Sequence, residues 1–361
     1  MNPAQRLHDA GQSLWLDSIN RTMLTNGTLA HYRDELAVTG LTSNPTILGH
    51  AMAAGDRYDD SLRAELSAGV RDPQQEVYAL ALEDLRAAAD LFRPIFDATG
   101  GVDGYVSLEV PPALAYDATT SIDLARRLHR QADRPNLLVK IPGTPAGLTA
   151  LEQCIVEGIG INVTLLFSDT QYLQTAETYL RALERRAEAG QPLGVPSVAS
   201  IFVSRWDKAA DPMLPVSMHG KLALAITQKV YASYRTILAS ERWATLASAG
   251  ARAQRVLWAS TSTKDPTFPD TYYLGKLAAP DTINTVPEKT LLAFADHGEV
   301  GELLQPDYAA ADQHIADVAA HHVDVDALAE SLQRQGAHAF EADWASLLDS
   351  IGTKAHKLAA A

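Results

Sequence analysis

The sequence predicts an α/β fold: a single (β/α)8 barrel of the TIM type over residues 1–361, with additional C-terminal helices from about residue 306. Eight short apolar runs alternate with longer amphipathic stretches, which is the order expected of a parallel sheet covered by helices. Eight such repeats in one unbroken chain favour a closed barrel. No G-x-G-x-x-G fingerprint follows an early strand, and this argues against a dinucleotide-binding sheet.

The predicted strands are short runs of apolar and β-branched residues bounded by turn residues. They cover residues 13–17, 38–42, 105–110, 137–141, 160–166, 197–203, 255–260 and 282–286.

Capping residues mark several helices between these strands. Asp72 and Pro73 form an N-cap and a first-turn proline. Ser168 or Asp169 caps a later helix, which ends before Gly190, a residue suited to the left-handed backbone at a helix end. The predicted helices cover about 73–91, 169–189 and 221–238, and further helices from 287 onward finish with 340–351 and a polar tail.

Composition and charge exclude several classes of protein. The net charge of −14 argues against non-specific binding to nucleic acid or anionic membranes. No apolar run approaches the roughly 20 residues of a membrane span, and the first thirty residues show no secretory signal. The one cysteine, Cys154, has the apolar neighbours of a helix core and fits a reducing compartment. We therefore expect a cytoplasmic enzyme.

Lys140 gives the clearest indication of chemistry. It lies in Leu-Leu-Val-Lys-Ile-Pro-Gly-Thr (137–144), a buried strand ended by a Pro-Gly turn. Burial disfavours the charged form of a lysine side chain in general, and the neutral amine is the form that attacks carbonyl carbons to give a Schiff base. The alternative is a lysine that ends the strand and extends its ammonium to solvent.

Polar side chains recur on one side of several predicted strands. Successive strand residues point to opposite faces, so Glu109 shares a side with Ser107, and Asn162 shares one with Thr164. Most of these polar residues lie toward the C-terminal strand ends, where barrel active sites are found. Any one of them could be a turn, cap or strand residue, but several on matching sides, together with a buried lysine, favour an active site.

Two segments closely resemble those of the transaldolase family. Gly-Leu-Thr-Ser-Asn-Pro-Thr-Ile-Leu (40–48) resembles its Thr-Ser/Thr-Asn-Pro signature, and Leu-Val-Lys-Ile-Pro-Gly-Thr-Pro-Ala-Gly-Leu (138–148) resembles its Schiff-base lysine segment. Other segments are similar to later strands of the family, the last two to its longer bacterial branch: 161–168, 200–207, 258–264 and 284–287.

The resemblance implies a class I Schiff-base aldolase barrel with neither metal nor organic cofactor. The expected enzyme is a transferase that moves a dihydroxyacetone unit from sedoheptulose 7-phosphate or fructose 6-phosphate to glyceraldehyde 3-phosphate or erythrose 4-phosphate. These sugars belong to carbohydrate metabolism in the pentose phosphate pathway. The expected partners are phosphorylated sugars only, with no nucleic acid and no membrane, and both a monomer and a homodimer remain open.

The resemblance also implies roles for single residues. Lys140 forms the Schiff base, and Asp17 is the acid–base that takes the C4 hydroxyl proton as the carbon–carbon bond breaks. Glu109 and Thr164 hold a water that shuttles protons during carbinolamine formation and dehydration. The residues expected to bind substrate are Asn44, Asn162, Ser200, Phe202, Arg205, Ser260 and Lys264.

Each of the two cations in this set, Arg205 and Lys264, has two possible roles. Arg205, just after the sixth strand, offers a bidentate fork to a phosphate, or else makes a surface ion pair. Lys264 lies where the family pattern has an arginine soon after the seventh strand's serine, but the stretch is longer here. Lys264 is therefore either a point charge for phosphate or a residue of the rim.

Two rival functions follow from the same motifs. An aldolase that releases free dihydroxyacetone from fructose 6-phosphate is the first, but such relatives are shorter and usually have tyrosine at the position of Phe202. A non-catalytic phosphosugar-binding homologue is the second, and it is expected to lack Lys140 or its acid–base partners. Metal-dependent chemistry is disfavoured because the eleven histidines form no H-E-x-x-H motif.

Overall fold

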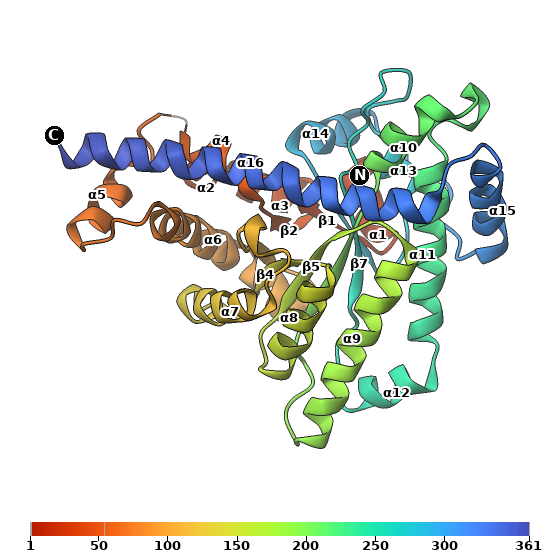
Figure 1. Cartoon of the computed structure of the whole chain (residues 1–361), viewed down its shortest axis with the longest axis horizontal. Helices are drawn as coiled ribbons and strands as arrows, with labels where there is room; N and C mark the ends of the chain where they lie inside the picture. The colour runs from red at the N-terminus through yellow and green to blue at the C-terminus, as the bar shows by residue number, and fades with distance from the viewer. Residues whose placement is uncertain (1, 54, 361) are drawn as a thin grey trace.

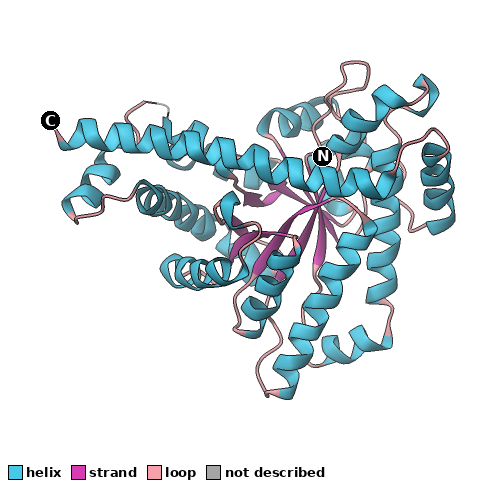
Figure 2. Cartoon of the chain, viewed as in Figure 1, coloured by secondary structure: helices cyan, strands magenta, loops and turns pink. Residues whose placement is uncertain are grey.

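A computed structural model describes residues 2–53 and 55–360 and contains the closed barrel of eight parallel strands (Figures 1 and 2). Each strand pairs with the next along the chain, and the eighth pairs with the first. The predicted strand ends are confirmed to within one residue. The strands are β1 (Gln12–Leu16), β2 (Val38–Thr42), β3 (Val106–Glu109), β4 (Leu137–Pro142), β5 (Ile161–Leu166), β6 (Ser197–Phe202), β7 (Arg255–Ala259) and β8 (Thr282–Val286).

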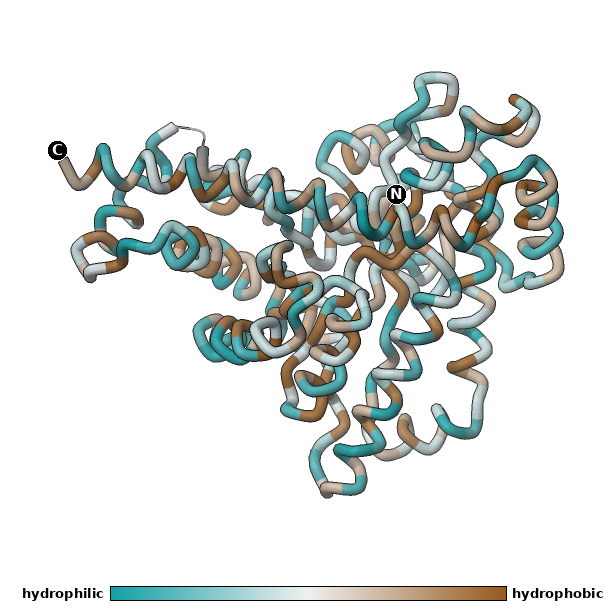
Figure 3. Tube along the Cα trace, in the orientation of Figure 1, coloured by the Kyte–Doolittle hydropathy of each residue, from teal (hydrophilic) through white to brown (hydrophobic). Residues whose placement is uncertain are grey.

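Helices surround the barrel, and the residues of the strands are more hydrophobic than the outer helix surfaces (Figure 3). The helices are α1 (Pro3–Asp9), α2 (Arg21–Thr25), α3 (Thr28–Glu35), α4 (Pro45–Ala53), α5 (Asp59–Ser67), α6 (Pro73–Ala98), α7 (Ala118–Ala132), α8 (Pro145–Val156), α9 (Asp169–Glu188), α10 (Ser204–Ala210), α11 (Leu222–Leu238), α12 (Glu241–Ser248), α13 (Tyr272–Lys276), α14 (Glu288–His297), α15 (Tyr308–Ala319) and α16 (Val325–Ala359).

The predicted caps are present, and one predicted helix end is wrong. Asp72 caps α6, and Ser168 rather than Asp169 caps α9 in a capping box with Gln171. However, α6 does not end near Leu91 but continues through Pro94 to Ala98. Proline removes one intrahelical hydrogen bond, but the buried face of α6 continues to Phe92, which lies beyond the predicted end.

The C-terminal region differs most from the prediction. In place of a helix over 340–351 and a polar tail, α16 is one helix of 35 residues that begins at Val325. It crosses the barrel and lies along α4, α5 and α6 (Figure 1). Buried side chains recur along its length, from Ala329 to Ala355, so packing against these helices stabilises a segment that is only weakly amphipathic.

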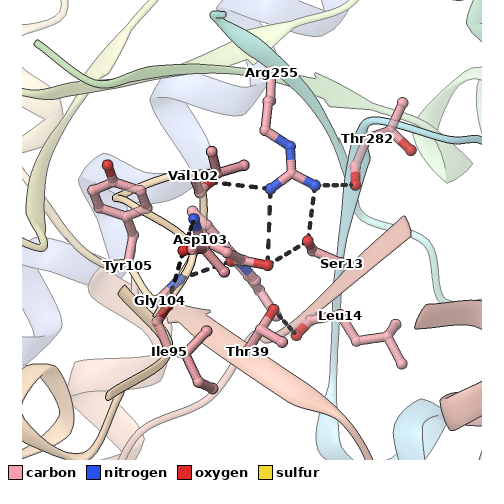
Figure 4. A network of polar contacts seen from close by, with 12 residues as sticks. Ser13, Leu14, Thr39, Ile95, Val102, Asp103, Gly104, Tyr105, Arg255 and Thr282 are labelled. Carbon is pink, nitrogen blue, oxygen red and sulfur yellow. Dashed lines mark hydrogen bonds and ion pairs between the residues drawn. The ribbon is translucent and has the colours of Figure 1, made fainter. Parts of the chain in front are cut away.

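The N-terminal end of the barrel holds a buried polar network (Figure 4). Asp103 accepts hydrogen bonds from the Ser13 hydroxyl and from Trp15 Nε1, the latter at 2.8 Å. Arg255 Nη2 donates to Ser13 Oγ at 2.8 Å and to the Thr282 carbonyl at 2.7 Å, and Arg255 Nη1 lies 3.8 Å from Asp103 Oδ2. Both charged side chains are buried, so each depends on the other for its electrostatic compensation.

Replacing Asp103 with alanine should therefore destabilise the protein. Asp103→Ala leaves the Arg255 guanidinium buried without a carboxylate, and we expect the free energy of unfolding to fall by about 3–5 kcal/mol. Urea denaturation measures this change. The control is Asp97→Ala, which removes an exposed pair with Arg93 on α6 and should cost less than about 1 kcal/mol. Equal small losses in the two variants would contradict a structural role for the network.

Candidate active site

A cavity of about 150 Å³ lies at the C-terminal ends of the strands. Eight of the eleven residues singled out in the sequence line it: Asp17, Asn44, Lys140, Ser200, Phe202, Arg205, Ser260 and Lys264. The other three, Glu109, Asn162 and Thr164, are buried on β3 and β5. The barrel thus brings together side chains from seven of its strands and the segments that follow them.

Lys140 is buried on β4, with its ammonium held inside the barrel. Its Nζ donates to Glu109 Oε2 at 2.9 Å and to the Ser43 carbonyl at 3.3 Å. The β3–β4 register places Glu109 directly opposite Lys140. Only 5% of Lys140 is exposed, so the alternative of a side chain extended into solvent is wrong. Burial raises the pKa of Glu109, and the adjacent ammonium opposes that rise.

Asp17 is the second carboxylate near this ammonium. It follows β1 and accepts a hydrogen bond from Thr42 Oγ1 at 2.7 Å. Burial raises the pKa of Asp17, while the Lys140 charge and the Thr42 hydrogen bond lower it in part. The negative charge of Asp17 in turn raises the pKa of Glu109. The two carboxyl groups are therefore coupled, and both hold a proton to higher pH than a carboxyl in water.

A chain of hydrogen bonds across three strands fixes the Asn162 amide. Ser200 Oγ donates to Asn162 Oδ1 at 2.7 Å, and Asn162 Nδ2 donates to Ser107 Oγ at 3.0 Å. Two residues further along β5, the Thr164 hydroxyl is buried and has no hydrogen-bond partner among the described residues. Asn44 has a structural role as well, because its Oδ1 accepts from the Ile47 backbone at the start of α4.

Cations gather on one side of the cavity. Arg205, in the first turn of α10, makes neither an ion pair nor a hydrogen bond with any described residue, so the surface ion pair considered from the sequence is wrong. Burial lowers the pKa of Arg205. Burial also lowers the pKa of Lys264, and the charges of Lys208 and Arg205 add to that effect. Lys264 lines the cavity, with its Nζ 2.6 Å from Ser262 Oγ. Positive side chains that form no ion pair with a described residue suit an anionic group in a protein of net charge −14.

The backbone at Ser260, directly after β7, is hydrogen-bonded to the start of α10, the helix that carries Arg205. Ser260 has a φ of +57°, a left-handed value that is unusual outside glycine. Its carbonyl accepts from the Ser204 backbone at 3.0 Å, and the two hydroxyls are 3.0 Å apart. Because Ser204 begins α10, this contact sets the starting point of the helix that carries Arg205.

Two residues of α16 contact the site, and the sequence did not indicate them. Phe340 is part of the cavity wall. Gln333 Nε2 donates to the carbonyls of Gly143 and Leu165, at 3.1 and 2.9 Å, at the ends of β4 and β5. The one local signal is Gly336 between them, since glycine in the middle of a helix is disfavoured unless something packs closely against it.

Neither a metal cluster nor a membrane helix is found in residues 2–53 and 55–360. Within these ranges no three His, Cys, Asp or Glu side chains are grouped so that they could hold a metal ion. No helix in the same ranges is both long and apolar enough to cross a bilayer.

Comparison with known proteins gives matches along almost the whole chain. A family model described as transaldolase/fructose-6-phosphate aldolase matches residues 14–351. The chain is 45% identical over 359 residues to a protein named transaldolase from Frankia alni, and the aligned region covers 97% of this chain and 96% of that relative. It is 44% identical to a transaldolase from Thermobifida fusca, with 97% of both chains covered. It is 42% identical to transaldolase 1 of Streptomyces avermitilis, with 97% and 94% covered.

The hydrogen bond from Thr42 gives a testable prediction for the ionisation of Asp17. In Thr42→Val the carboxylate loses a donor, so we expect the pKa of Asp17 to rise further. Carbon-13 NMR of labelled aspartate carboxyls measures the titration. Thr39→Val is the matched control, because Thr39 lies on the same strand and its hydroxyl bonds the Leu14 carbonyl instead.

The same change predicts a pH dependence of stability. A carboxyl whose pKa is raised by folding contributes stability that is fully present below its unfolded pKa and is lost as pH rises through its folded pKa. Thr42→Val should therefore lose more stability than Thr39→Val between acidic and neutral pH. An unchanged Asp17 titration in Thr42→Val would refute the role of this hydrogen bond.

Proposed function

The chain belongs to the transaldolase/fructose-6-phosphate aldolase family, and from this premise we propose that it transfers a dihydroxyacetone unit through a Schiff base on Lys140. It is a transferase with transaldolase activity. The proposed donor is sedoheptulose 7-phosphate or fructose 6-phosphate, and the proposed acceptor is glyceraldehyde 3-phosphate or erythrose 4-phosphate. The observation that carries the proposal is a buried lysine beside two carboxylates, at a cavity that two cations without an ion pair to any described residue also line.

The first half of the reaction forms the Schiff base. Glu109 Oε2, 2.9 Å from Lys140 Nζ, is close enough to take the ammonium proton and leave a neutral amine. The amine attacks the C2 carbonyl of the ketose and gives a carbinolamine. Loss of its hydroxyl as water requires a proton, which Glu109 returns through a water held with the free Thr164 hydroxyl. The product is an iminium that withdraws electrons from the neighbouring carbon–carbon bond.

The second half breaks and remakes a carbon–carbon bond. Asp17 takes the proton of the C4 hydroxyl, the C3–C4 bond breaks, and its electron pair enters the iminium to give an enamine on Lys140. The aldose phosphate leaves. The enamine then attacks the aldehyde of the acceptor, Asp17 returns the proton, and water releases the new ketose. The different hydrogen-bond partners of the two carboxylates, Lys140 for Glu109 and Thr42 for Asp17, support this division of proton transfers.

Positive side chains are proposed to bind the substrate phosphate. The Arg205 guanidinium has its donors free and can accept a phosphate in a bidentate arrangement. Lys264 adds a point charge beside it. Asn44, Asn162 and Ser200 are proposed to bind the hydroxyl groups of the dihydroxyacetone unit, supported by the fixed amide of Asn162.

The setting of the reaction is also a proposal. These substrates belong to the pentose phosphate pathway, and we propose that the enzyme works there, in the cytoplasm. Phe202 at the cavity wall supports transfer over release of free dihydroxyacetone. With fructose 6-phosphate alone the enzyme should therefore release little dihydroxyacetone, and sedoheptulose 7-phosphate should accumulate only when erythrose 4-phosphate is added as acceptor.

Trapping with borohydride tests the Schiff base. After incubation with fructose 6-phosphate and reduction, peptide mass mapping should find a dihydroxyacetone-sized adduct on Lys140. Lys140→Ala should abolish the adduct and reduce transfer below about 1% of the wild-type rate, because it removes the amine that attacks the ketose carbonyl. The control Lys357→Ala removes an exposed lysine near the end of α16 and should leave both unchanged. An adduct on another lysine would refute the assignment.

A comparison of the two carboxylates tests their division of labour. Asp17→Ala should still form the Schiff base but break the C3–C4 bond about 10²–10⁴-fold more slowly. The trapped adduct should then have the mass of the whole ketose phosphate. Glu109→Gln should instead slow the appearance of any adduct. If both variants trap the same species at the same rate, the proposed separation of roles fails.

A further inference from the structure

The guanidinium of Arg205 is oriented by packing alone. No described residue accepts a hydrogen bond from it, yet two aromatic rings lie close to its central carbon. The Phe202 ring centroid is 5.2 Å away and that of Phe340 is 5.8 Å away, both within the range of cation–π attraction. One ring belongs to the barrel and the other to α16. Rings that contact a guanidinium leave its N–H groups free for an anion.

The backbone of α16 also reaches Arg205, at Gly336. A Cβ atom built on Gly336 would lie 3.0 Å from Arg205 Nη1 and 2.8 Å from Leu165 Cδ2. A side chain at this position would therefore displace the guanidinium or its neighbour. Because alanine favours a helix more than glycine does, local helix stability does not explain a glycine here. Close approach to Arg205 and Leu165 does explain it.

Contacts with the catalytic strands fix α16 in position. Gln333 bonds the carbonyls at the ends of β4 and β5. On the other side of Phe340, the Trp344 ring lies 5.5 Å from that of Tyr78, whose hydroxyl donates to the Glu109 carbonyl at 3.2 Å. Phe340 thus lies between two anchored residues of α16: Gln333, bonded to the ends of β4 and β5, and Trp344, packed against Tyr78 of α6.

From these contacts we infer that Phe340 and Gly336 are positioning residues that make the site selective for phosphorylated sugars. They act through Arg205, and the inference rests on the phosphate-binding role proposed for it. A flexible arginine loses conformational freedom when it grips a phosphate, whereas one already packed between rings and backbone loses less. The benefit is confined to substrates that carry a phosphate.

A matched pair of glycine variants on α16 tests this. Gly336→Ala and Gly352→Ala are the same substitution in the same helix, but a Cβ on Gly352 meets only Pro73, at an ordinary 3.4 Å. The readout is kcat/KM for glyceraldehyde 3-phosphate and for glyceraldehyde as acceptors, with sedoheptulose 7-phosphate as donor. In a ping-pong mechanism these constants do not depend on the donor step.

We expect Gly336→Ala to lower the ratio of the two acceptor constants at least about fivefold, mainly through the KM of the phosphorylated acceptor. Gly352→Ala should leave the ratio unchanged, and neither variant should unfold at lower urea concentration than the wild type. Equal losses with both acceptors, or an unchanged ratio, would overturn the inference. A wild-type protein inactive with both acceptors would instead overturn the proposed function.

Phe340 allows an independent test through the ring. Phe340→Leu should lower the same ratio, and Phe340→Tyr, which keeps an aromatic face, should restore most of it. The effect of Phe340→Leu should disappear in an Arg205→Ala background, because a residue that acts through Arg205 has nothing left to position. A ratio that still falls in that background would show that Phe340 acts by another route and would refute the inference.

Discussion

The buried pair of Lys140 and Glu109 is the interaction on which the rest of the site depends. Two charges removed from water are tolerated only when each has a close partner and further hydrogen bonds. The β3–β4 register supplies the partner, and the Ser43 carbonyl supplies an additional acceptor. The register of β3 against β4 thus determines this pairing, because a shift of β3 by one residue would turn Glu109 to the opposite face of the sheet.

The cavity has two regions of different charge: carboxylates surround Lys140 in one, and two cations line the other. Asp17 and Glu109 lie around the ammonium, while Arg205 and Lys264 line the cavity from the first turn of α10 and from the loop after β7. Glu109 and Arg205 influence each other's ionisation, so the two regions are not independent. A ligand with a carbonyl at one end and a phosphate at the other matches this division, which is how a protein of net charge −14 can bind anionic sugars.

Much of the barrel could be predicted from sequence because its signals are local. Each strand is a short apolar run, and the alternation of polar residues such as Glu109 and Asn162 indicates which side faces inward. Long-range packing is not visible in this way. The beginning of α16 at Val325 and the continuation of α6 past Pro94 both depend on buried faces contributed by other helices. Phe340 looks like any core aromatic residue until its neighbours are known.

The order of elements along the chain has a consequence for biosynthesis. All eight strands precede α16, and synthesis proceeds from the N-terminus, so the barrel can close while Phe340 and Gln333 are still to be made. A nascent chain at that stage has Lys140 beside Glu109 but lacks part of the wall around Arg205. Each molecule would then form its catalytic pair of Lys140 and Glu109 first. The wall that makes the site selective for phosphorylated sugars would be completed later, when α16 packs onto the barrel.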